Sequence, residues 1–273
     1  MVGDLHLGGS QSQPTVPDSW QANDVIIFVG DILDHSSQGP TLGRELLKEL
    51  DALELETIVI PGNHDFNYYP DFADNLSFVR SIHRSAVTVN GWIFYGLGSD
   101  RFDDGSEVRY PDVPELSDAD SNPEQFERQL ADIVEDRSEL TDIVDTKRAA
   151  EAVQPSLQLY RNRLETLDDL APDQQEEKTV LVTHLPPFGT QTDQLSERNP
   201  RYPDRMLGSI AVRSHIRRMS PSFNFCGHIH EGEGAVKLEG CVCLNAGNGS
   251  TYSVKLDQKD LDAITQRTET LIE

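Results

Sequence analysis

The chain has 273 residues, of which 47 are acidic and 23 basic, so its formal net charge is −24. This length fits one large domain, or a domain that carries a sizeable insertion. No apolar run is long enough to span a membrane, no secretory signal is recognisable, and the negative charge opposes nucleic-acid binding at low salt.

Short β-branched runs recur along the chain, and each one ends in a polar motif. They comprise Val25–Val29, Thr57–Ile60, Thr179–Val182 and Phe223–Cys226. Nearly continuous apolar strands are typical of a sheet that is buried on both faces. Between the first two runs, one stripe of leucines predicts an amphipathic helix from about residue 42 to 53: Leu42, Leu46, Leu47, Leu50 and Leu53.

Two hairpins and a closing strand are predicted further along. Asn90-Gly91, between Ala86–Val89 and Trp92–Tyr95, is typical of a type I′ turn. Glu239-Gly240 joins a second pair of strands, Val236–Leu238 and Cys241–Leu244, and Tyr252–Leu256 follows as a closing strand. The pattern therefore predicts an α/β fold in which strands pack in two sheets with helices outside.

An acidic segment from about residue 103 to 178 interrupts this rhythm. It can hold two helices, one with apolar positions from Phe126 to Leu140 and one from Val153 to Leu167. We interpret residues 1–273 as a single domain and residues 103–178 as a helical insertion that packs on the core. The insertion either caps the site or is a purely structural, solvated addition.

The polar motifs predict a metal site. Ligands collect at the carboxyl ends of strands in open α/β sheets, which is where these motifs lie. Mixed nitrogen and oxygen ligands suit Mn, Fe, Zn or Co better than Ca. Two carboxylates against two divalent ions leave a positive site that can hold a phosphate. The candidate ligands are Asp4, His6, Asp31, Asn63, His184, His228 and His230.

Five motifs in this order resemble the calcineurin-like metallophosphoesterase superfamily. They are Asp4-Leu5-His6, Gly30-Asp31-Ile32-Leu33-Asp34, Gly62-Asn63-His64-Asp65, Thr183-His184 and Gly227-His228-Ile229-His230. Alone, the first motif could be a surface pair and the second and third could be ordinary turns, whereas the two alternating histidines after an apolar strand in the last motif are a stronger signal. The conjunction of all five motifs decides. The resemblance implies a four-layer αββα sandwich and hydrolysis of a phosphoester by a hydroxide that bridges two divalent metals, Mn foremost.

The resemblance also implies a role for each residue. The first metal would take Asp4, His6, Asp31 and His230, and the second would take Asp31, Asn63, His184 and His228. His64 would contact the phosphate and protonate the leaving oxygen, oriented by Asp34. We expect a small-molecule phosphoester as the substrate, in a phosphodiesterase or a phosphatase.

Two departures and two alternatives bear on the substrate. The segment from Gly208 to Gly234 looks like that of small archaeal and bacterial phosphoesterases, but Arg205-Met206-Leu207 stands where that subgroup often has a histidine. The serine/threonine protein phosphatases have Arg-Gly where this chain has His35-Ser36, and Glu where it has Asp65. These differences disfavour protein phosphatase activity. A nuclease of the same superfamily is disfavoured by the acidic charge, and a non-catalytic scaffold by the intact His64.

The remaining candidates have weaker signals. Arg101, Arg201 and Arg205 are considered as clamps for the substrate's phosphate or polar groups, whereas His35, His83 and His215 are expected to have no catalytic role. Only Met1-Val2-Gly3 precede Asp4. The strand expected before the first motif is therefore a stub, or else the natural chain starts upstream or has been shortened.

The acidic excess resembles that of halophilic archaeal proteins, in which dense carboxylates maintain hydration while salt screens their repulsion. An ordinary acidic protein is the alternative. Cys226, Cys241 and Cys243 lie in apolar strand-like segments without the spacing of a zinc site, so we expect reduced core cysteines and a cytoplasmic protein. The sequence leaves the oligomeric state open.

Overall fold

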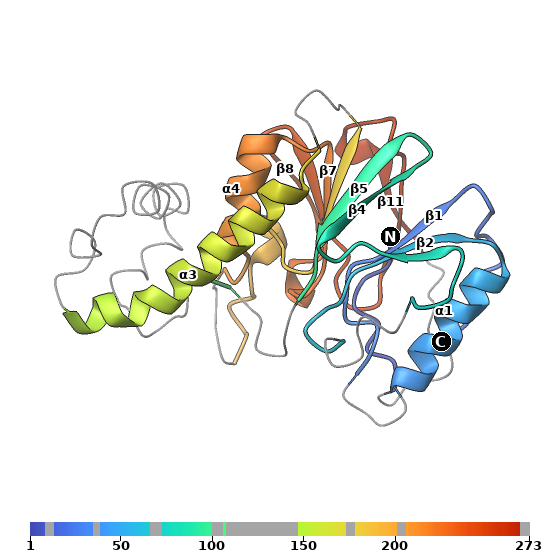
Figure 1. Cartoon of the computed structure of the whole chain (residues 1–273), viewed down its shortest axis with the longest axis horizontal. Helices are drawn as coiled ribbons and strands as arrows, with labels where there is room; N and C mark the ends of the chain where they lie inside the picture. Colours follow the sequence, from blue (N-terminus) through green and yellow to red (C-terminus); the bar gives the residue numbers. More distant parts are fainter. Residues whose placement is uncertain are drawn as a thin grey trace.

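The computed structural model describes residues 1–8, 14–34, 39–65, 73–99, 106–107, 147–172, 178–200 and 206–267. Its layers follow one another across Figure 1: helices α3 and α4, a six-stranded sheet, a second sheet, and helix α1. This is the four-layer αββα arrangement that the resemblance implied. Within the described residues, no helix is long and apolar enough to cross a membrane.

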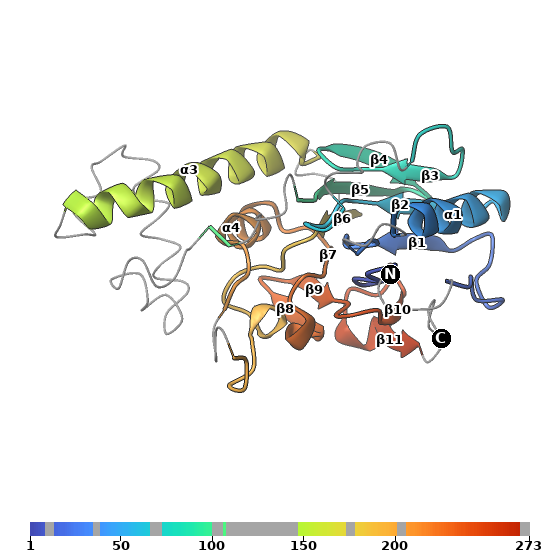
Figure 2. The ribbon, with the colours of Figure 1, turned by 90° about the horizontal axis from the view of Figure 1, so that it is seen from below.

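The first sheet contains parallel strands in the order β1-β2-β3. Their bounds are Val25–Phe28, Glu56–Val59 and Val79–Ser81. An antiparallel pair, β10 (Thr251–Val254) and β11 (Ile264–Arg267), lies beside them. Val2 joins the two parts, because it pairs in parallel with Phe28 and antiparallel with Thr251. The short N-terminal segment therefore acts as a strand at the middle of this sheet, and Figure 2 shows the N-terminus between β1 and β10.

The second sheet has six strands in the order β4-β5-β6-β7-β9-β8. The four inner strands are parallel, and an antiparallel hairpin closes each edge. The strand bounds are β4 Ser85–Val89, β5 Trp92–Leu97, β6 Thr179–Thr183, β7 Phe223–Cys226, β8 Gly234–Leu238 and β9 Cys241–Asn245. Asn90 and Gly91 have φ angles of 51° and 76°, so the predicted type I′ geometry is confirmed.

Among the residues that the structure describes, three hydrophobic clusters hold the layers together. Between the sheets, β1 and β2 side chains such as Ile27 and Ile58 pack against Phe94 and Val180. α1 (Gly39–Ala52) covers the outer face of the first sheet with Leu46, Leu47 and Leu50. The second sheet is covered by α3 and α4, where Leu167 and Ile216 meet Tyr95 and Leu181. Burial of apolar area on both faces of each sheet is the main stabilising contribution.

α3 (Lys147–Leu170) belongs to the predicted insertion, and α4 (Ile210–Met219) lies against it. The second half of α3 buries Tyr160 and Leu167, whereas its first half extends beyond the sheets in both views (Figures 1 and 2). Ser209 caps α4, since its side chain accepts a hydrogen bond from the Val212 amide. The helix predicted between Phe126 and Leu140 lies outside the described residues.

Some sequence expectations differ in detail from the structure. Leu53 was wrongly placed on the buried stripe: α1 ends at Ala52 and the Leu53 side chain is exposed. The chain leaves the helix through Glu54, whose positive φ turns it away from the helical path. β3 and β11 were not predicted, because short strands at sheet edges carry little periodicity. The three cysteines are free and buried, as expected.

Candidate metal centre

The polar motifs meet at one edge of the two sheets, where the parallel strands have their carboxyl ends. Three loops come from the first sheet and two from the second. The residues are Asp4 and His6 after the N-terminal segment, Asp31 after β1, Asn63 after β2, His184 after β6, and His228 and His230 after β7. All seven predicted ligands are therefore brought together, in two clusters that lie side by side.

The first cluster consists of Asp4, His6 and His230, whose ligand atoms all lie within 4.8 Å of one another. His230 Nε2 is 3.2 Å from Asp4 Oδ2 and 3.3 Å from His6 Nε2. The hydrogen bond that His230 donates to the Asp4 carboxylate raises the pKa of His230, although burial opposes this effect. Asp4 is fully buried, whereas 41% of the His230 side chain is exposed, so this cluster is the open side of the site.

The second cluster consists of Asp31, Asn63, His184 and His228. Asn63 Oδ1 lies 3.0 Å from His184 Nε2 and 3.0 Å from His228 Nδ1. His184 Nε2 is in turn 3.2 Å from His228 Nδ1 and 3.4 Å from Asp31 Oδ2. Three of these residues are nearly inaccessible, so this cluster is the closed side of the site.

Burial and charge together set the protonation of the second cluster. Burial disfavours the charged form of His184, but the carboxylates of Asp31 and Asp4 outweigh it and raise its pKa to about 10. Burial, together with the positive charge of His184, lowers the pKa of His228 to about 3. Without a metal ion, the positive charge of protonated His184 therefore offsets the negative charge of the Asp31 carboxylate, and His228 is neutral.

The donor set fits divalent transition metals. Each cluster combines imidazole nitrogens with a carboxylate, and the second cluster adds the amide oxygen of Asn63. Such a mixed nitrogen and oxygen donor set suits Mn, Fe, Zn or Co. Asp4 Oδ1 is fully buried and accepts no hydrogen bond from the described residues, although His184 Nδ1 lies 4.0 Å away. A buried carboxylate oxygen without a hydrogen-bond donor is costly unless a cation balances it.

The glycines of the motifs allow the ligand side chains to approach the backbone. A Cβ on Gly62 would lie 2.0 Å from Asp31 Oδ1, and a Cβ on Gly227 would lie 2.4 Å from Asp4 Oδ1. His6, Asp31 and His228 themselves have positive φ angles of 48°, 50° and 68°. Such strain in residues other than glycine is concentrated at functional sites.

Asp65 fixes the loops that carry the second cluster, and the sequence analysis did not assign it this role. Its Oδ2 accepts hydrogen bonds from the amides of Ile32 and Gly62, and its Oδ1 accepts one from Leu33. Burial and the charge of Asp31 raise its pKa to about 7. The available signal was its position in the Gly62-Asn63-His64-Asp65 turn, because aspartate side chains often bond to nearby backbone amides.

His64 and Asp34 lie at the open side of the site. His64 Nδ1 is 3.8 Å from Asp34 Oδ1, which is an ion-pair distance rather than a hydrogen bond. The His64 ring meets that of His6 edge to face, with centroids 4.7 Å apart, and its amide donates to Asp31 Oδ1 over 2.8 Å. His64 is therefore next to both clusters, and 24% of its side chain faces solvent.

A second buried aspartate, Asp193, connects the loop after β6 with the turn before α4. Its carboxylate accepts hydrogen bonds from the amides of Gly189, Thr190 and Gly208. The spacing of Thr190 and Asp193 is a capping pattern that was available in the sequence. The amide group of Asn245 ties the same segment to the β7 loop, because it donates to the carbonyls of Thr192 and Ile229.

The other predicted residues lie apart from the two clusters or outside the described part of the chain. His215 is a helix residue, as expected, and lies buried between Tyr95 and Asp168. His83 follows β3, and its Nδ1 accepts a hydrogen bond from the Gly98 amide. His35, Ser36, Arg101, Arg201 and Arg205 lie outside the described residues.

Comparison with known proteins gives three kinds of similarity. The sequence model of the family described as calcineurin-like phosphoesterase matches residues 1–232. A curated relative, the UPF0046 protein K07C11.7 of Caenorhabditis elegans, is 30% identical over 87 residues, or 32% of this chain. The matched part spans 27% of that relative's length.

Solved structures resemble the chain over most of its length. One crystal structure matches with a TM-score of 0.49 and 16% identity, covering 89% of this chain and 87% of its own. The protein TT1561 of Thermus thermophilus matches with a TM-score of 0.47 and 14% identity, covering 91% of this chain and 86% of its own.

Proposed function

Because the chain belongs to the calcineurin-like phosphoesterase family and is thus a metal-dependent hydrolase of phosphoester bonds, we propose that it uses two metal ions to hydrolyse a small phosphoester. The observation that carries the two-metal proposal is the pair of adjacent clusters, Asp4-His6-His230 and Asp31-His184-His228. We propose manganese as the native metal, with iron, zinc or cobalt as substitutes that the same donor set accepts.

The ligands are assigned to the metals by cluster. Asp4, His6 and His230 would hold the first ion, and Asn63, His184 and His228 the second, with Asp31 shared between them. When bound, the two ions would neutralise the phosphate's charge and activate the attacking water. Two carboxylates leave such a site with a net positive charge, which favours an anionic substrate.

His64 would donate a proton to the leaving oxygen. Its ring is partly exposed and lies against His6, so it faces the open side from which a substrate arrives. Asp34 would orient the ring through Nδ1, leaving Nε2 toward the substrate. The 3.8 Å separation would shorten to a hydrogen bond as the substrate closes the site, since catalytic contacts often tighten only in the complex.

We propose a small-molecule phosphoester rather than nucleic acid as the substrate. The net charge of −24 repels polyanions at low salt, and screening by salt weakens that repulsion. The bound ions would supply positive charge at the two clusters, which suits a compact anion. Diester and monoester hydrolysis are both compatible with one buried and one open cluster.

The test is a panel of three substrates with manganese added, in low and in high salt. Bis-p-nitrophenyl phosphate reports diesterase activity, p-nitrophenyl phosphate reports monoesterase activity, and single-stranded DNA reports nuclease activity. We expect turnover of one or both small esters and none of DNA. Faster turnover of DNA would assign a nuclease instead, and failure on all three with metal bound would refute the proposal.

A further inference from the structure

The loop after β7 carries one ligand of each cluster, His228 of the second and His230 of the first. His228 is held inside the site, because its amide donates to Asp4 Oδ2 over 2.7 Å and its Nδ1 lies 3.2 Å from His184 Nε2. His230 begins a short 3-10 turn, η4 (His230–Gly232), and 41% of its side chain is exposed. The placement of His230 therefore depends on what holds the backbone on either side of it.

Asn245, at the end of β9, holds the residue before His230. Its side chain is fully buried, and Nδ2 donates to the carbonyls of Ile229 and Thr192 over 2.8 Å each. The two hydrogens of the amide can serve one carbonyl each, and Oδ1 accepts from the Gly247 amide over 2.8 Å. Because buried carbonyls need donors, this side chain fixes the Ile229 carbonyl at one place in the loop.

Glu231 holds the residue after His230. Its Oε2 accepts a hydrogen bond from the Ser196 amide, and its Oε1 accepts one from Asn199 Nδ2 over 2.9 Å. These two donors lie a few residues beyond Thr192, which is the other partner of the Asn245 side chain. One stretch of chain, residues 192–199, is therefore bonded to the β7 loop on both sides of His230.

This stretch of chain is itself anchored to the fold. It begins in the 3-10 turn η3 (Gln191–Asp193), which packs against η4. The buried carboxylate of Asp193 accepts hydrogen bonds from the amides of Gly189 and Gly208, each over 3.0 Å. The stretch can therefore act as a fixed support for His230, because it is held independently of the β7 loop.

We propose that Asn245 and Glu231 are positioning residues for His230, and that their support sets the affinity of the first cluster for its metal ion. The inference rests on the proposed function, since that proposal assigns His230 to the first of two ions. A ligand that is already in place loses less conformational freedom when the ion binds. The second ion is affected less, because contacts inside the site hold His228.

The test measures the affinity of each ion separately. The full chain is freed of metal by a chelator and titrated with Mn²⁺ in a calorimeter, and His230→Ala identifies the binding phase that belongs to the first ion. We expect Asn245→Ala to weaken the first ion about tenfold, which is the low end of the loss seen when groups that orient metal ligands are removed. The affinity for the second ion should change less than about twofold.

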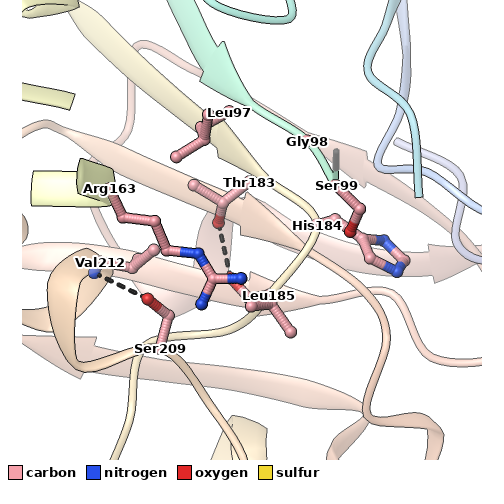
Figure 3. A pocket seen from close by; sticks show the side chains of 9 residues that line it. All are labelled: Leu97, Gly98, Ser99, Arg163, Thr183, His184, Leu185, Ser209 and Val212. Atoms are coloured by element: carbon pink, nitrogen blue, oxygen red, sulfur yellow. Dashed lines mark hydrogen bonds between the residues drawn. The ribbon is translucent and has the colours of Figure 1, made fainter. Parts of the chain in front are cut away.

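Asn224→Ala is the matched control, because Asn224 is an equally buried asparagine on the neighbouring strand β7. Its Nδ2 donates to Thr183 Oγ1 over 3.0 Å, and Thr183 in turn donates to the Leu185 carbonyl (Figure 3). This asparagine is thus tied to the loop after β6 and not to the loop of His230. Both variants should lose stability in urea, but only Asn245→Ala should weaken the first ion.

Glu231→Gln is a second variant whose folding is not at risk, because the side chain is exposed. A glutamine would present an NH₂ group to one of the two donors, so we expect the first ion to bind about threefold more weakly. Glu233→Gln removes the same charge two positions along, where the carboxylate contacts Tyr252 and Gln266 instead. We expect this control to bind both ions as the wild type does.

The outcomes separate this inference from the proposed function. Unchanged affinities in Asn245→Ala, equal weakening of both ions, or the same loss at the first ion in Asn224→Ala overturns the positioning roles. If Asn245→Ala does not fold, an unchanged first ion in Glu231→Gln, or an equal loss in Glu233→Gln, overturns them. A wild-type chain that binds two ions but hydrolyses no phosphoester refutes the proposed function and leaves the positioning roles standing. A single ion whose binding His230→Ala does not alter overturns both.

Discussion

His184 Nε2 lies 3.4 Å from Asp31 Oδ2, although the two residues follow strands of different sheets. Asp31 lies in the loop after β1 of the first sheet, and His184 directly follows β6 of the second. The buried pair therefore joins the two sheets at their carboxyl ends. It also makes metal binding depend on how the sheets pack, which leads to the first two predictions.

Asp31→Asn is expected to lose metal. The substitution removes the negative charge from the centre of the second cluster, and an amide binds a divalent cation less well than a carboxylate. Elemental analysis of the purified variant measures the loss. Asp34→Asn is the matched control, because Asp34 lies 3.8 Å from His64 at the open side, and we expect it to keep its metal. Equal metal content in both variants would show that Asp31 is not a ligand.

Metal affinity is expected to rise with pH. The pKa of His184 is raised to about 10 in the metal-free site, so a metal ion must displace its proton. Below that pH, apparent affinity should increase about tenfold per pH unit for one displaced proton. Calorimetric titration with Mn²⁺ in buffers of different ionisation enthalpy counts the protons released. A count of zero would contradict the protonated state of His184.

His64→Ala is expected to retain both metals and to lose most of the rate. General acid catalysis contributes about 10²–10⁴-fold, and His64 belongs to the proposed acid rather than to the ligand set. The measurements are kcat on p-nitrophenyl phosphate and metal content by elemental analysis. Loss of metal together with activity would instead make His64 a ligand, in line with its place in the group His6-Asp34-His64.

Asp65→Asn is expected to destabilise the loops around the site, although Asp65 is not a proposed metal ligand. Three backbone amides point at the carboxylate, and an asparagine would present an NH₂ group to at least one of them. Such a clash of buried donors costs about 1–3 kcal/mol in the free energy of unfolding. Urea unfolding measures this cost, and weaker Mn²⁺ binding should accompany it. Unchanged stability would show that the three hydrogen bonds contribute nothing net.

Asp168→Asn is expected to loosen the contact between α3 and α4. Asp168 Oδ1 is 3.0 Å from His215 Nδ1, and Oδ2 is 2.6 Å from Arg218. Burial opposes ionisation, but His215 and Arg218 outweigh it and lower the pKa of Asp168 below 3.8. Its stabilisation is therefore present above about pH 4 and lost as the pH falls through the lower folded-state value.

The magnitude is modest because the pair is partly exposed. About 1 kcal/mol between wild type and Asp168→Asn is expected near pH 7 after allowance for solvent screening. Urea unfolding near pH 7 and near pH 3 measures the difference, which should shrink at the lower pH. A difference that grows as the pH falls would reverse the sign of the proposed linkage.

Residue types and their spacing were sufficient to predict much of the fold. The apolar runs that became β1, β2, β6 and β7 are recognisable because a strand buried on both faces must be apolar at nearly every position. The hairpin at Asn90-Gly91 is recognisable because few residues tolerate two positive φ angles. β11 and the end of α1 at Ala52 were not predicted, because local periodicity is weak there.

The sequence by itself determined which seven side chains would form the candidate metal centre, because Asp, Asn and His at the ends of successive strands have few other reasons to recur. Only the tertiary structure decided how they divide into an open and a closed cluster, since that depends on how the two sheets pack. It also decided the contacts of Asp65 and Arg163. Their partners Gly62 and Glu107 lie 3 and 56 positions away, and Glu107 meets Arg163 only because α3 folds back onto α4.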